Sequence, residues 1–377
     1  MPAPASPDLL HPGCSRRHAL AGLGAVLLGG ASAQRPRLSL PAGLSSRQLA
    51  GQRIIGSYAG LTPPASLLTS IRNGQLAGVI FFAGNISTPA QLAAVVRQLR
   101  QAQSQSPIKL PLLLMTDQEG GEVRRLPGQP TQSEKQIGQS KDPVTAATAA
   151  GTGAGKNLAS VGLNVNLGPV LDVYRQPGNF IDEYQRSYSS NPAVVAQLGR
   201  AFITAQQRTK VAATAKHFPG LGAAAKNQDT DAGPVTLNVP LTQLRAVDEA
   251  PYPAAIAAGA KLVMVSWAVY PALDPHRPAG LSSTVIQQEL RARHRFAGVT
   301  ITDALEAGAL KAFGSTAHRA ITAAAAGMDL ILCAAQQPSQ AESATTALAS
   351  ALTSRQLSKT AFDAALSRVT ALRAGLS

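Results

Sequence analysis

Charged side chains follow several short apolar runs of this chain, at points where strands would end. Lys216 and His217 come directly after one such run, and Asp303 follows another. Asp117 opens a third polar cluster, which continues to Arg125. Groups of these types bind polar ligands, transfer protons or attack an electrophilic carbon. They lie far apart in the sequence, so only the fold can bring them together.

Acidic residues that converge from different strands permit metal binding, acid–base chemistry or glycosidic cleavage by paired carboxylates. A metal site is disfavoured, because His217 is the only histidine near a predicted strand end. Gly220 and Gly222 follow it without the Lys-Ser/Thr sequel of a phosphate-binding loop. Carboxylates among Arg and Lys donors suit an uncharged or mildly acidic polyhydroxylated ligand. We therefore expect a polyhydroxylated ligand and neither a metal nor a cofactor.

The elements that must position these residues are eight short β-rich runs, which alternate with longer helical patterns. The predicted strands are Arg53–Tyr58, Gly78–Phe82, Leu112–Thr116, Leu163–Leu167, Val211–Ala215, Leu262–Ser266, Val299–Thr302 and Met328–Cys333. Runs that are apolar throughout are typical of parallel strands covered on both faces. Eight alternations predict a single (β/α)8 TIM-type barrel, with a doubly wound open sheet as the alternative. The tail from Gln337 to Ser377 is expected to form the last barrel helix and an extra C-terminal helical segment.

In a parallel barrel the loops after the strands meet at one face, where functional residues gather. Asp117 follows the third predicted strand, Lys216 and His217 the fifth, and Asp303 the seventh. The sixth strand ends at Ser266, next to Trp267. We expect the charged residues to share one site at this face.

The first 33 residues predict an export signal. A basic region with Arg16 and Arg17 precedes an apolar run from Ala19 to Gly30, and Ala31-Ser32-Ala33 is a small-residue cleavage site. The paired arginines resemble a twin-arginine signal, with a general secretory leader as the alternative. We expect residues 34–45 to be loose and residues 46–377 to form the barrel domain. The protein should be extracellular or in the cell envelope, without a membrane span.

The composition excludes some classes of partner. The formal net charge is +14, yet aromatic residues make up only 4% of the chain and no run of Lys and Arg exceeds two residues. A stacking platform for nucleic acid is therefore not expected, and diffuse positive charge fits weak attraction to an anionic envelope or polymer. We expect no nucleic-acid partner and a monomeric protein.

Three motifs resemble those of family 3 glycoside hydrolases. They begin at Asp117 in T-D-Q-E-G-G, at Lys216 in K-H-F-P-G and at Gly298 in G-V-T-I-T-D-A-L, and the likeness spans roughly residues 53–328. The nearest branch looks like the single-barrel bacterial β-N-acetylglucosaminidases. The resemblance implies a retaining mechanism with Asp303 as the nucleophile. It also implies five sugar-binding residues, which are Asp117, Arg125, Arg186, Lys216 and His217.

One loop departs from that family. Where the branch has Asp-Ser-His, with the histidine as general acid/base, this chain has Asn227-Gln228-Asp229. Asp229 is therefore our candidate acid/base, as a carboxylic acid with a raised pKa. Asp231 or Glu306 is an alternative donor. A further alternative is that the donor is lost, so that the protein binds sugar or cleaves only substrates with good leaving groups.

Two smaller departures accompany the changed loop. Leu221 and Trp267 stand where this family commonly has histidines. The sequence as a whole predicts an exported hydrolase that acts on β-linked N-acetylglucosamine, or a related β-glycoside, in cell-wall-type saccharides. The alternatives are a non-catalytic carbohydrate-binding barrel and a β-glucosidase-type enzyme.

Overall fold

A computed structural model describes residues 40–376 of the chain, and these residues fall in one compact unit. The predicted export signal at residues 1–33 and residues 34–39 of the predicted loose segment lie outside the described part. Both remain predictions, as do the domain limits that depend on them.

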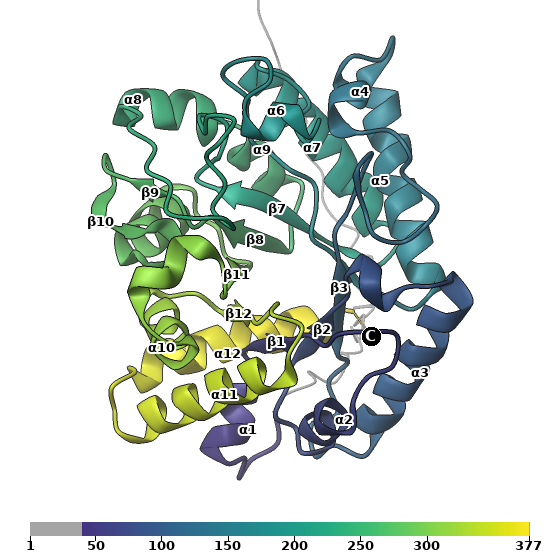
Figure 1. Ribbon diagram of the computed structural model, residues 1–377, viewed down its shortest axis with the longest axis vertical. Coiled ribbons are helices and arrows are strands. Elements are labelled where there is room, and N and C mark those ends of the chain that lie inside the picture. Colours follow the sequence, from purple (N-terminus) through teal and green to yellow (C-terminus); the bar gives the residue numbers. More distant parts are fainter. Residues whose placement is uncertain (1–39, 377) are drawn as a thin grey trace, which may run out of the picture. The chain divides into compact units, whose positions relative to one another are not determined.

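Eight parallel strands close into a barrel and follow one another around it in sequence order (Figure 1). The barrel strands are β1 (Ile54–Gly56), β2 (Gly78–Ile80), β3 (Leu113–Thr116), β6 (Val165–Asn166), β7 (Ala212–Phe218), β8 (Leu262–Val265), β11 (Val299–Ala304) and β12 (Leu330–Leu332). Each coincides with one of the eight predicted runs. The predicted (β/α)8 barrel is therefore confirmed, and the open doubly wound sheet is excluded.

Helices surround the barrel on its outside (Figure 1). The α-helices are α1 (Ser46–Gly51), α2 (Ala65–Arg72), α3 (Pro89–Ser104), α4 (Glu134–Gly138), α5 (Pro143–Ser160), α6 (Phe180–Glu183), α7 (Pro192–Gln207), α8 (Leu241–Gln243), α9 (Tyr252–Ala257), α10 (Thr316–Ala326), α11 (Pro338–Thr353) and α12 (Lys359–Ala374). Two π-helices, η2 (Leu244–Asp248) and η4 (Thr284–Arg293), and three 3₁₀ helices, η1 (Ala83–Asn85), η3 (Ala279–Leu281) and η5 (Gly308–Phe313), complete the helical elements of residues 40–376. Several helices begin as the sequence indicates, with a capping side chain before a first-turn proline, as at Asp142 before α5.

Two short antiparallel hairpins decorate the barrel. Strands β4 (Gln118–Gly120) and β5 (Val123–Arg124) form one, directly after β3. Strands β9 (Val269–Tyr270) and β10 (Asp274–Pro278) form the other, after β8. The first hairpin shapes the loop that carries Asp117 and Arg125.

The barrel interior is filled by apolar side chains from the strands, among them Ile55, Met115 and Ile301. Val369 and Leu372 of α12 belong to the same interior cluster. Arg373 of α12 donates to the carbonyl oxygens of Pro111 at 2.7 Å and of Leu110 at 3.0 Å, just before β3 begins. Helix α12 therefore closes the end of the barrel at which the strands start.

A buried carboxylate ties α12 to the barrel at that end. Asp329, directly before β12, forms ion pairs with Arg291 of η4 at 2.6 Å and with Arg368 of α12 at 2.8 Å. Arg53 donates to the Asp329 carbonyl at 3.1 Å, and its guanidinium lies 4.4 Å from the ring centroid of Phe362. The predicted C-terminal helices thus form an integral part of the barrel.

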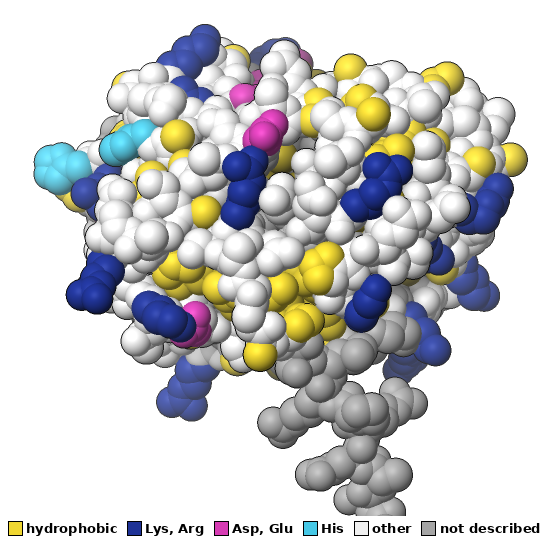
Figure 2. Space-filling model, turned by 90° about the horizontal axis from the view of Figure 1, so that it is seen from below, with side chains coloured by type: hydrophobic (Ala, Val, Ile, Leu, Met, Phe, Trp, Pro, Cys, Tyr) yellow, Lys and Arg dark blue, Asp and Glu magenta, His cyan; other side chains and the backbone are white. Residues whose placement is uncertain are grey.

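Positive charge is spread over the surface. Figure 2 shows Lys and Arg side chains scattered singly across one face, with apolar and uncharged groups between them. Within residues 40–376, no helix has both the length and the apolar character needed to cross a bilayer.

Candidate active site

A pocket of about 190 Å³ opens at the carboxyl ends of the barrel strands. It receives residues from the ends of β2, β3, β7, β8, β11 and β12, as expected for this fold. The structure brings together every site residue predicted from the sequence. These pocket-lining residues are Asp117, Arg125, Arg186, Lys216, His217, Asp229 and Asp303.

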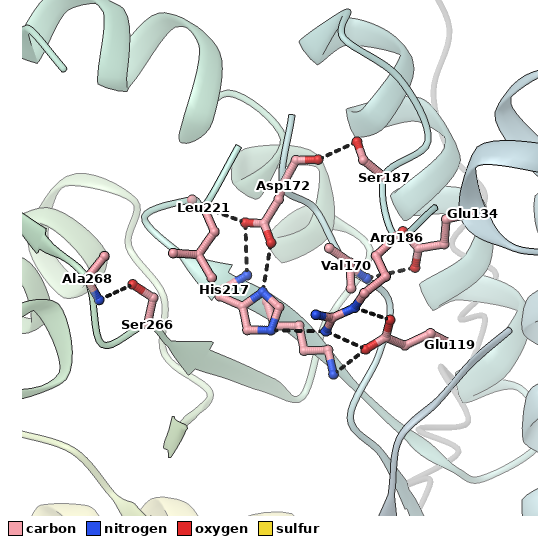
Figure 3. Close-up of polar contacts among 12 residues, drawn as sticks. Glu119, Glu134, Val170, Asp172, Arg186, Ser187, His217, Leu221, Ser266 and Ala268 are labelled. Atoms are coloured by element: carbon pink, nitrogen blue, oxygen red, sulfur yellow. Dashed lines mark hydrogen bonds and ion pairs between the residues drawn. The ribbon is translucent and has the colours of Figure 1, made fainter. Parts of the chain in front are cut away.

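A buried network of four charged groups forms one side of the pocket. The ammonium of Lys216 lies 2.7 Å from Asp117 Oδ1 and 2.6 Å from Glu119 Oε1. Arg186 grips Glu119 through two bonds, from Nε at 2.8 Å and from Nη2 at 2.9 Å (Figure 3). Such bidentate pairs fix direction as well as charge. The network therefore holds the side chains of Asp117, Lys216 and Arg186 in set positions around a ligand.

These groups hold one another in their charged forms. Burial alone would raise the pKa of Glu119, but Arg186 and Lys216 outweigh it and keep that pKa well below its usual range. Burial likewise opposes the charge of Lys216, while Asp117 and Glu119 raise its pKa above the ordinary value. The direct ion pairs of Lys216 are with Asp117 and Glu119, and it forms none with Asp303 within residues 40–376.

His217 is oriented by Asp172. Its Nδ1 lies 2.7 Å from Asp172 Oδ2, and the backbone N–H groups of His217 and Leu221 donate to Asp172 Oδ1 at 3.3 and 2.8 Å (Figure 3). The carboxylate thus favours the tautomer with a proton on Nδ1, an assignment made from the hydrogen-bond network. The remaining ring nitrogen, Nε2, faces Arg186 Nη2 at 3.5 Å.

Arg125 has an unused donor. Its Nε is buried and has no hydrogen-bond partner within the described residues, although Arg125 lines the pocket. A buried N–H without a partner costs free energy, which a ligand oxygen would recover. Arg125 is therefore suited to donate to a ligand hydroxyl or carbonyl.

Asp303 lies at the end of β11, between Thr302 and Ala304, and both of these neighbours form hydrogen bonds to other elements. Its Oδ1 accepts the backbone N–H of Ala304 at 2.7 Å. The indole N–H of Trp267 donates to the Ala304 carbonyl at 2.8 Å, and Leu332 N–H donates to Thr302 Oγ1 at 2.9 Å. Trp267 is fully buried and does not line the pocket, so it supports the backbone beside Asp303 from behind.

The loop after β7 carries Asp229 and Asp231 into the pocket wall. The Asp229 side chain accepts the N–H of Asp231 at 2.9 Å, which makes a tight turn. Gly308 N–H donates to the Asp231 carbonyl at 2.8 Å, and Ala309 N–H donates to the Thr230 carbonyl at 2.9 Å. Backbone bonds thus fasten this loop to the segment that follows Asp303.

Asp231 differs electrostatically from an ordinary aspartate. The residue is exposed to solvent at the rim of the pocket. Partial desolvation, followed by repulsion from Asp303, Asp229 and Glu306, raises the pKa of Asp231 to about 7, while His217 opposes the shift.

Three residues of the site were not singled out from the sequence. Glu119 and Asp172 organise the cations and the histidine of the pocket. Glu134 lies behind them, where its Oε1 accepts the Val170 N–H at 2.8 Å (Figure 3) and burial raises its pKa well above the usual range. Glu119 stands within the same motif as Asp117, and Asp172 follows the fourth strand. Position after a strand was thus a usable signal for both.

One group of potential metal ligands occurs within residues 40–376, and it lies away from the pocket. It consists of Glu249, Glu289 and His294, none of which lines the pocket. Arg245 and Arg293 each pair with Glu289 at 2.8 Å, so cationic side chains already occupy one of these carboxylates. The group therefore forms an ion-pair cluster between the ends of η2 and η4.

The sequence of residues 47–372 matches the glycosyl hydrolase family 3 N-terminal domain. The chain belongs to this family. The resemblance inferred from the three motifs is thereby confirmed, and the chain is a glycoside hydrolase by descent and by fold.

Several known proteins resemble the chain over most of its length. A protein of Arthroderma benhamiae, named as an uncharacterized secreted glycosyl hydrolase, is 44% identical over 87% of this chain and 93% of its own. A β-N-acetylglucosaminidase from Paenibacillus superposes with a TM-score of 0.83 at 34% identity, over 88% of this chain and 63% of that one. A β-N-acetylhexosaminidase from Beutenbergia cavernae gives 0.80 at 32% identity, over 88% of this chain and 99% of that one.

Proposed function

We propose that this family 3 protein is an exported β-N-acetylhexosaminidase, which cleaves β-linked N-acetylglucosamine or a related β-glycoside from cell-wall-type saccharides. The observation that carries the proposal is the position of Asp303. This carboxylate lines a small pocket together with sugar-binding types of side chain, at the end of a barrel strand. The activities named for the Paenibacillus and Beutenbergia proteins support the choice of sugar.

The proposed reaction retains the configuration at the anomeric carbon. The Asp303 carboxylate forms a bond to that carbon as the bond to the leaving oxygen breaks, and a carboxylic acid gives the leaving oxygen its proton. Water then attacks the same carbon and releases Asp303, while the former acid takes the proton of the water. No metal or cofactor enters either step.

Five residues are proposed to bind the sugar. Asp117 accepts hydrogen bonds from ring hydroxyls, while Arg125, Arg186 and Lys216 donate to its oxygens. His217 contributes Nε2, the ring nitrogen that faces the pocket-lining Arg186. Support comes from the ion-pair network that fixes Asp117, Arg186 and Lys216 before a ligand arrives, because prior ordering reduces the entropic cost of binding.

Export and the monomeric state are also proposals. Export is supported by the leader-like sequence before residue 34 and by the secreted Arthroderma relative. Sizing the purified protein and sequencing the N-terminus of the exported form would test both.

A panel of aryl β-glycosides tests the function, with wild type and Asp303→Ala compared on each. We expect the N-acetylglucosaminide to be the best substrate and Asp303→Ala to lose almost all activity. Preference for the glucoside would indicate a β-glucosidase-type enzyme. Sugar binding without turnover of any substrate would indicate a non-catalytic barrel, and unchanged activity of Asp303→Ala would refute the nucleophile assignment.

A further inference from the structure

The proposed reaction needs a proton donor, and the structure offers three carboxyl groups near Asp303. Two, Asp229 and Asp231, lie on the loop after β7, and the third, Glu306, follows β11. Asp229 occupies the position of the family's catalytic histidine in an ungapped alignment and is the donor predicted from the sequence. The contacts of these three side chains distinguish between them.

The carboxylate of Asp229 is engaged within its own loop. Its Oδ1 accepts the N–H of Asp231 at 2.9 Å. This carboxylate oxygen is therefore already occupied by a donor from its own loop. The backbone carbonyl of Asp229 accepts the N–H groups of Ala232 and Gly233 at 3.2 and 3.0 Å. The contacts of Asp229 are those of a residue that shapes the turn.

Glu306 is engaged outside the pocket. Its Oε2 accepts the Ala334 N–H at 3.2 Å and a side-chain N–H of Gln340 at 3.0 Å. Glu306 does not line the pocket. Its carboxyl therefore connects the segment after β11 to the beginning of α11, where a leaving group would not reach it.

We propose that Asp231 is the general acid/base of the reaction, held beside Asp303 by the backbone of the segment after β11. Asp231 lines the pocket, and within residues 40–376 its carboxyl forms neither a hydrogen bond nor an ion pair. The bond from Gly308 N–H to its carbonyl ties it to a segment that begins five residues after Asp303. This inference deepens the proposed function and depends on it for the identity of the substrate.

The charges that face Asp231 suit this task. Partial desolvation, together with Asp303 and Asp229 on the pocket wall and Glu306 behind them, favours its protonated form, whereas His217 favours the ionised form. Asp231 is thus a carboxylic acid near neutral pH when Asp303 is ionised. Once Asp303 is bonded to the sugar its negative charge is gone, so Asp231 loses its proton more readily and can then accept one from water.

The two proton transfers are balanced by the two bond changes at the anomeric carbon. In the first step the Asp231 O–H proton moves to the glycosidic oxygen, as the electron pair of the breaking C–O bond leaves with that oxygen. In the second step the Asp231 carboxylate takes a proton from water, as the water oxygen bonds to the anomeric carbon and the bond to Asp303 breaks. Asp231 ends the cycle protonated, as it began.

The test compares Asp231→Asn and Asp229→Asn with wild type, using the exposed Asp363→Asn on α12 as a matched control. For Asp231→Asn we expect kcat/KM on an unactivated disaccharide to fall by roughly 10²–10⁴-fold. A dinitrophenyl glycoside should react in a burst, because its leaving group needs no proton while release from Asp303 still needs a base. Azide should restore turnover and yield the β-glycosyl azide.

The pH profile separates the two aspartates. Wild type should lose kcat/KM as pH rises through about 7, where Asp231 gives up its proton. Asp231→Asn should lack that alkaline limb. Asp229→Asn should keep it, and its activity should change by less than roughly tenfold, because an amide oxygen can still accept the Asp231 N–H.

Several results would overturn the assignment. One is azide rescue in Asp229→Asn but not in Asp231→Asn, and another is an unchanged alkaline limb in Asp231→Asn. If wild type cleaves no β-N-acetylglucosaminide but cleaves another glycoside, the proposed substrate is wrong and the same variants test Asp231 on that glycoside.

A titration that does not require activity tests the role of Asp231 even if wild type cleaves none of the substrates. Carboxyl carbon NMR of protein labelled at aspartate, assigned with Asp231→Asn, should show Asp231 ionising near neutral pH. In Asp303→Asn its ionisation should move to lower pH, because one repelling charge is removed. A carboxyl of Asp231 that ionises below about pH 5 in wild type, close to an ordinary aspartate, would overturn the proposal.

Discussion

Lys216 illustrates how the pocket uses single residues. Its side chain is almost wholly buried, and its one ammonium contacts two carboxylates that stand two positions apart in the sequence. Burying a charge is costly unless partners compensate for it, and Asp117 and Glu119 do so here. The same contact aims the Asp117 carboxylate at the pocket.

We predict that Lys216→Met weakens both folding and sugar binding. Removing one partner from a buried ion pair costs about 3–5 kcal/mol, because Asp117 and Glu119 lose their shared cation. Chemical denaturation and titration with N-acetylglucosamine would measure the two losses. Lys226→Met, which removes an exposed lysine paired with Glu183, is the control and should leave both unchanged. Equal behaviour of the two variants would contradict this account of the network.

Glu134 should make folding stability depend on pH. Burial raises its pKa in the folded state far above the 4.5 of an exposed glutamate, so the unfolded chain releases this proton first as pH rises. From about pH 4.5 upward, wild type should therefore lose stability relative to Glu134→Gln, by at most about 1.4 kcal/mol per pH unit.

Denaturation midpoints of wild type and Glu134→Gln at pH 5, 6 and 7 would measure this difference. The amide can still accept the Val170 N–H, so the variant should fold. Glu342→Gln, at an exposed ion pair with Arg47, should show little change. A constant difference between wild type and Glu134→Gln over this range would mean that Glu134 is ionised in the folded protein.

At the scale of elements, the site depends on two loops that meet across the barrel mouth. The loop after β7 supplies Asp229 and Asp231, while Asp303 lies in β11 and Gly308 in the segment that follows it. A side chain at Gly308 would place its Cβ 2.4 Å from the Ala232 carbonyl oxygen and 2.7 Å from that of Asp231. Glycine is required there because the two backbones touch.

We predict that Gly308→Ala displaces the loop and so impairs proton transfer. The kcat on an unactivated disaccharide should fall and the alkaline limb of the pH profile should shift, while the burst from a dinitrophenyl glycoside persists. Gly233→Ala, in the same loop but with open space around the added carbon, is the matched control and should behave as wild type. Identical pH profiles for all three proteins would show that the contact at Gly308 does not position Asp231.

The sequence predicted these elements better than it predicted their contacts. All eight strands were readable, because continuous apolar runs that end at charged residues are local features. Lys216, His217 and Asp303 could be assigned to one face for the same reason. The role of Asp172 could not be predicted, and Asp231 was only one of two alternative donors, because their contacts involve backbone groups far away in the sequence, such as Leu221 and Gly308. Trp267 also follows a strand, yet its indole lies behind Asp303 and does not line the pocket.

At the scale of the whole molecule, the pocket and the stabilising helix α12 lie at opposite ends of the barrel. The pocket lies at the carboxyl ends of the strands, and α12 closes the opposite end with Val369 and Leu372. Phe362 of the same helix packs beneath the Arg53 guanidinium in the core. Changes at α12 should therefore alter folding without altering the reaction.

We predict that Phe362→Ala lowers stability by about 3–5 kcal/mol, as expected for a large aromatic side chain removed from a core. Its kcat/KM at 25 °C should remain close to that of wild type. Phe362→Leu should lose less stability than Phe362→Ala, because leucine fills more of the cavity. Denaturation midpoints and initial rates would measure these effects, and a selective loss of kcat/KM with unchanged stability would contradict the separation.

The position of α12 also determines how the enzyme could be mounted on a support. The end of this helix lies beside the starts of β8 and β11, on the side of the barrel away from the pocket. A bead, surface or fused carrier joined behind α12 would therefore hold the pocket facing outward. The support would then not obstruct the approach of large saccharides to the pocket.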